Sequence, residues 1–487
     1  MEYTSTRNNT LSVQAAQAIL KGIAPDGGLF VPKHFPQLPA QEVYGLTYPQ
    51  TAEKVLSRFL SDYDSEFLHQ AVHQVYGDPF AQKAGYICPV GSSGMYALEL
   101  WHGPTCAFKD YALQLMPKLL VQAKKILGDQ GVTKILVATS GDTGKAALAG
   151  YADLPGIKIA VFYPNDGTSE IQRLQMATQQ GENVAVYAVQ GNFDDAQTGV
   201  KLVFADKQVE QMLADKGERL SSANSINWGR LVPQIVYYFY AYAQLVEQGA
   251  VQDGDQVDFC VPTGNFGDIL AGYYAKQMGL PVGKLICASN RNNVLTDFLK
   301  TGCYDARRAF YKTESPSMDI LVSSNLERLL YHVTENSEKV AEWMAQLNHD
   351  GHYQVDTDTL AKIQEIFACG CADDQDGAYE IGSCFSENKY LMDPHTAVAW
   401  HVAKAIRKND ASRACVVLST ASPYKFPGSV LAALEQTVPA DEFEALAQLE
   451  HTSGIPAPAS LRELRQRPER FHEVIGKETI REIALSL

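Results

Sequence analysis

Lys109 is the residue of this sequence with the clearest chemical potential. It follows a mostly apolar stretch at 95–101, which predicts a strand, and a Gly103-Pro104 break. Thr105 can cap the helix expected next, so Lys109 lies in the first turn of that helix, which Pro117 is expected to divide. A free lysine amine has a pKa of roughly 10.4, and desolvation or the positive potential of a helix N-terminus lowers it. Lys109 is therefore a candidate for imine chemistry, and the alternative is a solvated surface lysine.

A glycine-rich loop in the middle of the chain is suited to bind a phosphate. It follows an expected strand at 257–261 and begins an expected helix. Backbone N–H groups at a helix start bind anions, and Gly264 and Gly267 leave them unobstructed. The alternative is a tight strand-to-helix connection without a ligand.

The loop at 140–144 invites comparison with a nucleotide-binding P-loop, because a Gly-Lys pair follows an expected strand. A P-loop needs glycine where Thr139 stands, and serine or threonine where Ala146 stands. We therefore expect a polar helix N-terminus that binds a carboxylate or phosphate of a small substrate.

Two later polar segments could complete a site. Arg230 ends a polar cluster at 224–230, and its guanidinium can bind a phosphate through two parallel hydrogen bonds. Hydroxyl groups at 419–422 end an expected strand and could meet the ring nitrogen of a cofactor. The alternatives are a helix cap or surface arginine, and a simple turn that ends a strand.

The elements that position these loops repeat as strand, loop and helix. This repetition is typical of parallel α/β sheets with helices on both faces, which bind ligands at the carboxyl ends of their strands. Residues 1 to about 90 form a separate mixed module with a helix from Leu11, a turn at 25–28 and a strand at 29–31. The other expected strands are 135–138, 158–163, 184–189, 257–261, 285–288 and 414–418.

Composition excludes several classes of partner. The chain has 487 residues, 46% of them hydrophobic, and a formal net charge of −15, which argues against nucleic acid and acidic membranes. We find neither a membrane-spanning apolar run nor a signal peptide, so we expect a cytoplasmic protein. Nine scattered cysteines predict reduced thiols. The spacing of Cys369, Cys371 and Cys384 does not fit zinc, and segment 372–383 does not fit calcium, so no metal site is expected.

Taken together, these motifs resemble those of the fold type II enzymes that depend on pyridoxal phosphate. Their residue sequences resemble those of the threonine synthases. Two positions depart from the family pattern: Cys106 replaces the usual aliphatic residue, and Ser422 stands where histidine is common. The segments that carry the resemblance are, in chain order, 25–32, 102–105 with 108–110, 139–144, 264–268, 315–320, 393–397 and 419–421.

The resemblance implies a tryptophan synthase β-like α/β fold with two parallel or mixed α/β domains and an N-terminal α+β module. The module is expected at 1–92 and the catalytic core at 93–430, with a smaller α/β domain nested at about 128–222. Residues 431–487 are expected to form a helical C-terminal extension.

The resemblance also assigns roles to single residues. It implies that Lys109 holds pyridoxal 5′-phosphate covalently and then serves as acid and base, and that Thr420 faces the pyridine nitrogen. The cofactor phosphate would be held by Gly264, Asn265, Phe266, Gly267 and Asp268. The substrate carboxylate would be met by Ser140, Gly141, Asp142 and Thr143, and a second phosphate by Ser225, Asn227 and Arg230, with Lys145 as a further candidate.

The implied activity is conversion of O-phospho-L-homoserine and water to L-threonine and phosphate by γ-elimination and β-addition, the last step of threonine biosynthesis. We expect a monomer or homodimer. The alternatives are a threonine dehydratase, a cysteine synthase or another lyase of this fold, none of which needs a second phosphate pocket, and a catalytically silent metabolite-binding protein.

Overall fold

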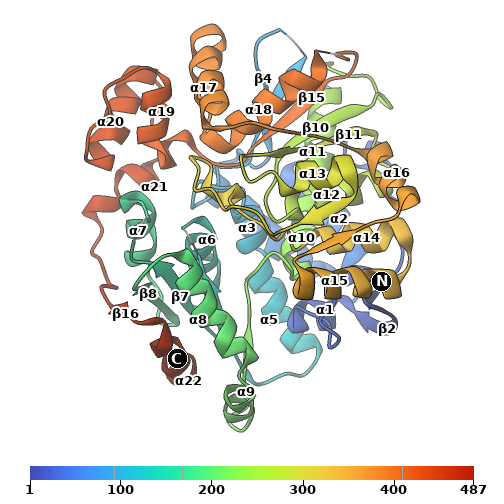
Figure 1. Cartoon of the computed structure of the whole chain (residues 1–487), viewed down its shortest axis with the longest axis vertical. Coiled ribbons are helices and arrows are strands. Elements are labelled where there is room, and N and C mark those ends of the chain that lie inside the picture. The colour runs from blue at the N-terminus through green and yellow to red at the C-terminus, as the bar shows by residue number, and fades with distance from the viewer. Residues whose placement is uncertain (93, 140, 167, 409) are drawn as a thin grey trace.

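The computed structural model describes residues 1–92, 94–139, 141–166, 168–408 and 410–487 (Figure 1). A six-stranded sheet forms its larger part, and five of the strands are parallel, while β4 runs antiparallel to β5 at one edge. The strand order is β14 (Phe367–Cys371), β11 (Val282–Ser289), β10 (Val257–Pro262), β15 (Cys415–Ser419), β5 (Met95–Glu99) and β4 (Tyr86–Pro89). The α/β class expected from the sequence is confirmed.

A second sheet of five parallel strands lies below the first in Figure 1. Alternate residues of a strand point to opposite faces, and both faces are covered here. Ile135 and Val137 share a core with α6 (Asp142–Tyr151), whereas Leu136 shares another with α8 (Phe193–Ala205). The strand order is β16 (Val474–Ile475), β8 (Val184–Val189), β7 (Ile157–Pro164), β6 (Val132–Ala138) and β9 (Glu218–Ser221).

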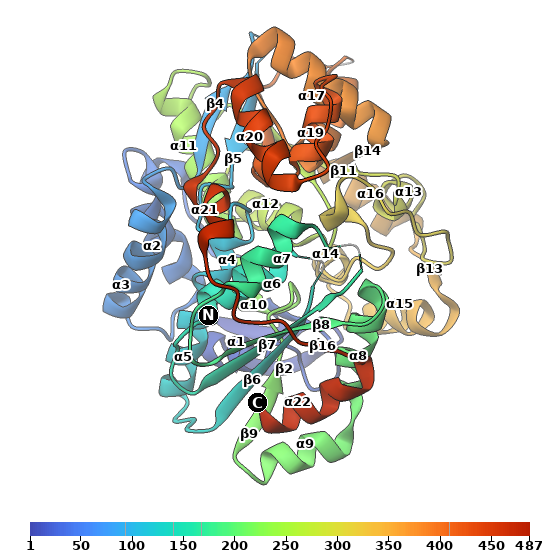
Figure 2. The same cartoon turned by 90° about the vertical axis from the view of Figure 1, so that its left-hand side faces the viewer.

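The chain beyond 431 is mostly helical, and it adds one strand to this second sheet. After α20 (Glu442–Ser453) and α21 (Ala459–Arg462) it descends to β16, which pairs in parallel with β8, and ends in α22 (Ile480–Ser486) against α8 (Figure 2). A two-residue strand carries no alternating pattern, so the sequence did not predict it. The expected domain boundaries stay predictions.

The N-terminal module differs from expectation in where its first helix begins. Residues 8–14, which include Leu11, form β2 (Asn8–Gln14), and α1 begins at Ala15. Pairing with a neighbouring strand overrides the local helical pattern. The module contains the antiparallel strands β1 (Glu2–Ser5), β2 and β3 (Phe30–Pro32), with the helices α1 (Ala15–Lys21), α2 (Tyr48–Phe59) and α3 (Ser65–Tyr76).

The segment around Lys109 is helical in two pieces, as the proline predicts. α4 (Asp110–Leu113) ends before α5 (Met116–Ile126), whose first turn holds Pro117. Thr105 does not cap α4, contrary to expectation. Its N–H donates to Asp110 Oδ2 at 2.8 Å and its hydroxyl to Oδ1 at 2.7 Å, so the buried aspartate holds the preceding loop.

The remaining helices and strands complete the layers around the sheets. These elements are α7 (Glu170–Ala177), α9 (Lys207–Ala214), α10 (Trp228–Leu231), α11 (Ile235–Glu247), α12 (Gly267–Gln277), α13 (Val294–Thr301), β12 (Cys303–Asp305), α14 (Leu326–Thr334), α15 (Ser337–Asp350), β13 (His352–Gln354), α16 (Thr357–Ile366), α17 (Asp374–Asn388), α18 (Pro394–Arg407) and α19 (Pro427–Ala433). None of the helices in the described ranges is long and apolar enough to cross a membrane.

Candidate active site

Lys109 lies one residue before α4, and its amine is buried between polar groups. Nζ donates to Ser317 Oγ at 3.1 Å and to Asp142 Oδ2 at 3.4 Å. Burial lowers the pKa of Lys109, and the positive charges of Lys425 and Arg230 lower it further, while Asp142 opposes them. The structure therefore provides both conditions that a nucleophilic lysine requires, desolvation and positive neighbours.

Asp142, the first residue of α6, is held between two lysines. Its carboxylate accepts from Lys109, pairs with Lys425, whose side chain is fully buried, and accepts from Gln172 Nε2 at 3.3 Å. Burial opposes ionisation, but Lys425 and Lys109 hold the pKa of Asp142 well below its usual range. The ionised side chain repels a substrate carboxylate, so only the backbone N–H of Asp142 is suited to bind one.

The loop between β10 and α12 has the form of an anion cradle. Its carbonyls are occupied: Gly264 O accepts from Ser323 Oγ at 2.8 Å, and Asn265 O accepts from the backbone and side chain of Asn325. The N–H groups of Gly264, Asn265 and Phe266 donate to no described residue. Phe266 has a left-handed φ of 64°, which turns the chain into the helix. Unpaired N–H groups at the start of an eleven-residue helix suit a phosphate.

The cradle adjoins Lys109 through one residue. A β-carbon on Gly264 would lie 2.8 Å from the carbonyl oxygen of Ser317, whose hydroxyl accepts from Lys109. Asp268, in the first turn of α12, is buried, and burial raises its pKa to about 6. Asp268 Oδ1 accepts from the N–H of Ile269 at 2.9 Å, so this carboxyl supports the helix start.

Thr420 lies directly after β15, beside the loop that carries Lys109. Its carbonyl accepts from the N–H of Phe108 at 2.8 Å, and Ala107 forms a bridge with Ala421. The Thr420 hydroxyl has no hydrogen-bond partner among the described residues. β15 and β5 are parallel neighbours, so their carboxyl ends bring this hydroxyl and the lysine to one edge of the sheet. Ser422 accepts from the N–H of Tyr424 at 3.4 Å and caps a short turn.

A hydrogen-bonded chain that the sequence did not predict supports Ser317. Asp393 Oδ1 accepts from His395 Nδ1 at 2.7 Å, and His395 Nε2 accepts from the N–H of Ser317 at 3.1 Å. In this arrangement His395 Nε2 is the acceptor from Ser317, and Nδ1 is the donor to Asp393. Segments 315–320 and 393–397 both carry the family resemblance. The sequence does not show that Asp393 and His395 support Ser317, because they lie 76 and 78 positions further along the chain.

Arg230 is a buried cation without an acidic partner in the described part of the chain. Nη1 donates to Ala223 O at 2.8 Å, Nε has no partner, and burial lowers its pKa to about 10. Asn227 is committed to structure instead: its Oδ1 accepts from Gly229 N and its Nδ2 donates to Ile19 O at 3.0 Å. A buried unpaired guanidinium is costly unless a ligand neutralises it.

Arg328 ties this cluster to the cradle and to the N-terminal module, and no motif in the sequence identifies it. It is fully buried on α14 and donates to the carbonyls of Phe30 and Ile226 and to the side chain of Asn325. Asn325 in turn holds the carbonyl of Asn265. One side chain thus fixes both anion-binding segments.

The remaining expected residues are distributed as follows. Gly141 donates its N–H to Thr139 Oγ1 at 3.0 Å, and Thr143 is the second residue of α6, so its N–H has no carbonyl partner within the helix. Ser225 is half-buried just before α10. Ser140 lies outside the described residues.

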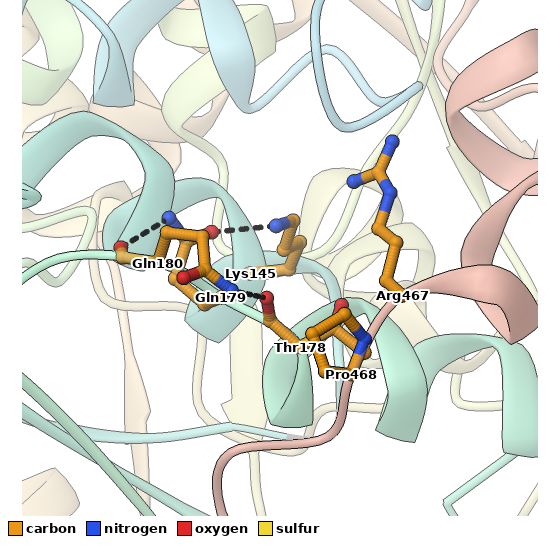
Figure 3. A pocket seen from close by; sticks show the side chains of 6 residues that line it. All are labelled: Lys145, Thr178, Gln179, Gln180, Arg467 and Pro468. Atoms are coloured by element: carbon orange, nitrogen blue, oxygen red, sulfur yellow. Dashed lines mark hydrogen bonds between the residues drawn. The ribbon is translucent and has the colours of Figure 1, made fainter.

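Lys145 has a hydrogen-bond partner of its own. Its amine donates to Gln179 Oε1 at 2.6 Å. Lys145 and Arg467 both line a cavity of about 300 Å³. Figure 3 shows the side chains that line it. Burial and the charge of Arg467 lower the pKa of Lys145 to about 8. Its hydrogen bond goes to Gln179, and its role as a phosphate ligand stays a prediction.

Three family models match most of the chain. A family described as pyridoxal-phosphate dependent enzyme matches residues 89–420. A model described as threonine synthase N terminus matches 2–76, and one described as threonine synthase, C-terminal, matches 396–483.

The names of similar proteins agree with these family models. Threonine synthase of Pseudomonas aeruginosa is 40% identical over 438 residues, with 88% of this chain and 90% of that protein covered. Threonine synthase-like 1 of Homo sapiens is 42% identical over 436 residues, but the chain spans only 58% of its length.

Solved structures share the fold from end to end. PLP-bound threonine synthase from Brucella melitensis is 35% identical with a TM-score of 0.88, and covers 100% of this chain and 99% of its own. The yeast threonine synthase is 31% identical with a TM-score of 0.89, at the same coverage. The fold type II architecture expected from the sequence is confirmed.

Proposed function

The chain belongs to the threonine synthase family, and from that membership we propose that it converts O-phospho-L-homoserine and water to L-threonine and phosphate with pyridoxal 5′-phosphate. One observation carries the proposal. Two sets of anion-binding groups lie in the neighbourhood of the buried amine of Lys109: the unpaired N–H groups at 264–266, and the guanidinium of Arg230, which has no acidic partner among the described residues and whose Nε is unpaired. A cofactor phosphate and a substrate phosphate would occupy the two sets.

The residues present fit the cofactor. The cradle offers N–H groups to its phosphate, the Thr420 hydroxyl is free to meet its ring nitrogen, and Lys109 is placed to hold it covalently. Gly264 permits the cradle to pack against Ser317, because a β-carbon there would collide with the carbonyl of that residue. When bound, the cofactor supplies an electron sink for charge that develops on the substrate carbons.

Lys109 carries the proton transfers of the proposed reaction. Replacing a γ-phosphate by a β-hydroxyl requires removal of a proton at Cα and another at Cβ, loss of phosphate, addition of water at Cβ and return of protons at Cα and Cγ. Because its pKa is lowered by burial, the Lys109 amine can accept and return protons more readily than a solvated lysine. Ser317 and Asp142 hold Nζ in place between these transfers.

The site concentrates positive charge in a protein of net charge −15. Lys109, Lys425 and Arg230 gather there, and Asp142 is the carboxylate that pairs with both lysines. The N–H groups of Asp142 and Thr143 begin α6 and can donate to the substrate carboxylate. A dianionic phosphate that pairs with Arg230 would relieve the cost of its buried charge, which favours the phosphorylated substrate.

The test is a comparison of substrates with the purified holoenzyme. O-phospho-L-homoserine should give threonine and phosphate in equal amounts. L-Threonine and O-acetylserine with sulfide, assayed in parallel, should give little 2-oxobutyrate or cysteine. Release of 2-oxobutyrate without conversion of O-phospho-L-homoserine would instead identify a threonine dehydratase.

The cytoplasmic location, the monomeric or homodimeric state and the absence of a nucleic-acid partner stay predictions of the sequence. Size-exclusion chromatography with light scattering decides the oligomeric state.

A further inference from the structure

Three side chains on two helices of the N-terminal module converge at the surface. His69 and His73 are four residues apart on α3, so both project from one face of the helix. Glu53 faces them from α2, with Oε1 at 2.9 Å from His69 Nδ1 and at 2.8 Å from His73 Nε2. The three candidate ligand atoms all lie within 4.8 Å of one another.

We propose that Glu53, His69 and His73 form a binding site for a divalent transition-metal ion, with Zn²⁺ as the representative. Two imidazole nitrogens and one carboxylate oxygen are a ligand set that zinc accepts at about 2.0–2.2 Å, with a fourth position left for water. Imidazole ligands favour Zn²⁺, Cu²⁺ or Ni²⁺ over Mg²⁺ and Ca²⁺, which prefer oxygen.

The arrangement needs little adjustment to take the ion. Both histidines now share one carboxylate oxygen, and an ion placed between them would replace the two hydrogen bonds and release the protons on the coordinating nitrogens. The side chains of Glu53, His69 and His73 are 32%, 54% and 40% exposed, so the ion has an open path and the rotamers have room to spread.

The site is separate from the one that holds Lys109, and its proposed effect is structural. α2 and α3 already pack together through their apolar faces. An ion bound by one ligand from α2 and two from α3 would add a cross-link at the outer edge of this pair, so it stabilises the module without contacting substrate or cofactor.

The experiment measures Zn²⁺ binding to tag-free holoenzyme stripped with EDTA, by competition with a chromophoric chelator. Wild type should bind one ion at this site. His69→Ala and His73→Ala should each weaken binding by at least the roughly 10-fold that loss of an outer partner of a metal ligand causes. His349→Ala, a highly exposed histidine that pairs with Asp350, should bind as wild type does.

A zinc-soaked crystal measured at the zinc absorption edge locates the ion independently. An anomalous peak between Glu53, His69 and His73 supports the site. Equal affinity in wild type and His73→Ala, or a peak only at other residues such as the exposed Cys371, overturns it. The three variants should fold and turn over substrate as wild type does, because none of these residues lies in the candidate active site.

Discussion

Lys109 Nζ donates to Ser317 Oγ at 3.1 Å, although the two residues are 208 positions apart in the chain. The carbonyl of the same serine faces Gly264, where a β-carbon would lie 2.8 Å away. Ser317 therefore fixes the lysine and limits the width of the phosphate cradle at once, and the chain from Asp393 through His395 holds Ser317.

Replacing Lys425 by methionine should raise the pKa of Lys109. The positive charge of Lys425 lowers that pKa, and its loss also frees Asp142 to pair with Lys109 alone. Covalent attachment of the cofactor, followed by visible absorbance during reconstitution, should shift to higher pH in Lys425→Met. Lys134→Met is the matched control, because Lys134 is also a buried lysine with an acidic partner, Glu218, but it lies on β6 of the second sheet. A shift to lower pH, or an equal shift in both variants, would contradict the electrostatic account.

Gly264→Ala should weaken cofactor binding while the apoprotein still folds. The new methyl group meets the Ser317 carbonyl, and overpacking of this kind shifts the backbone. Loss of one N–H hydrogen bond to the charged phosphate costs about 1.5–3 kcal/mol, which is about 10- to 150-fold in Kd. Fluorescence titration of the apoprotein with pyridoxal phosphate measures the change. Gly377→Ala, where a β-carbon meets nothing closer than 4.0 Å, should bind as wild type does. Unchanged affinity in Gly264→Ala would remove the loop from the cofactor site.

Arg230→Met should damage catalysis and stabilise the apoprotein together. The guanidinium is buried without an acidic partner, so its removal relieves an uncompensated charge, and Tm should rise. Loss of a desolvated partner of the substrate phosphate should cost about 2–5 kcal/mol of binding free energy in the transition state. This corresponds to a decrease in kcat/KM of more than about 10-fold. Calorimetry and steady-state kinetics check the two effects. A variant with unchanged kinetics would exclude Arg230 from the phosphate site.

Asp268→Asn should change how stability depends on pH. Burial raises the pKa of this carboxyl from 3.8 to about 6 in the folded protein. The folded state therefore binds more protons than the unfolded state between these values, and wild type loses stability as pH rises through that window, by about 3 kcal/mol in total. The variant lacks this loss, so its advantage in free energy of unfolding should grow from pH 4 to pH 7. Urea unfolding of the apoproteins at both pH values would show the opposite trend if Asp268 were stabilised as an anion.

The sequence predicted those parts of the site that are local. A lysine before a helix and a glycine loop after a strand are each visible within ten residues, so Lys109 and the 264–268 cradle could be identified. Lys425 and Arg328 could not, because each acts through a partner far along the chain: Lys425 pairs with Asp142, and Arg328 reaches the carbonyls of Phe30 and Ile226.

Local signals also led to errors where packing decides. The pattern from Leu11 predicted a helix, but the segment pairs as β2 with β1. Thr105 donates to Asp110 instead of capping α4. The role of Asn227 in phosphate binding stays a prediction; its side chain also caps α10 and donates to the carbonyl of Ile19. The i, i+4 spacing of His69 and His73 was readable in the sequence, but only the fold brings Glu53 to them.

The central claim, threonine synthesis at Lys109, is tested most directly by turnover of O-phospho-L-homoserine in water enriched in ¹⁸O. Elimination breaks the bond between carbon and oxygen, so phosphate leaves with its bridging oxygen and water adds at Cβ. The account predicts one ¹⁸O atom in the hydroxyl of threonine, none in the released phosphate, and no turnover by Lys109→Ala. Label in the phosphate with homoserine as the product, or an active Lys109→Ala variant, would contradict it.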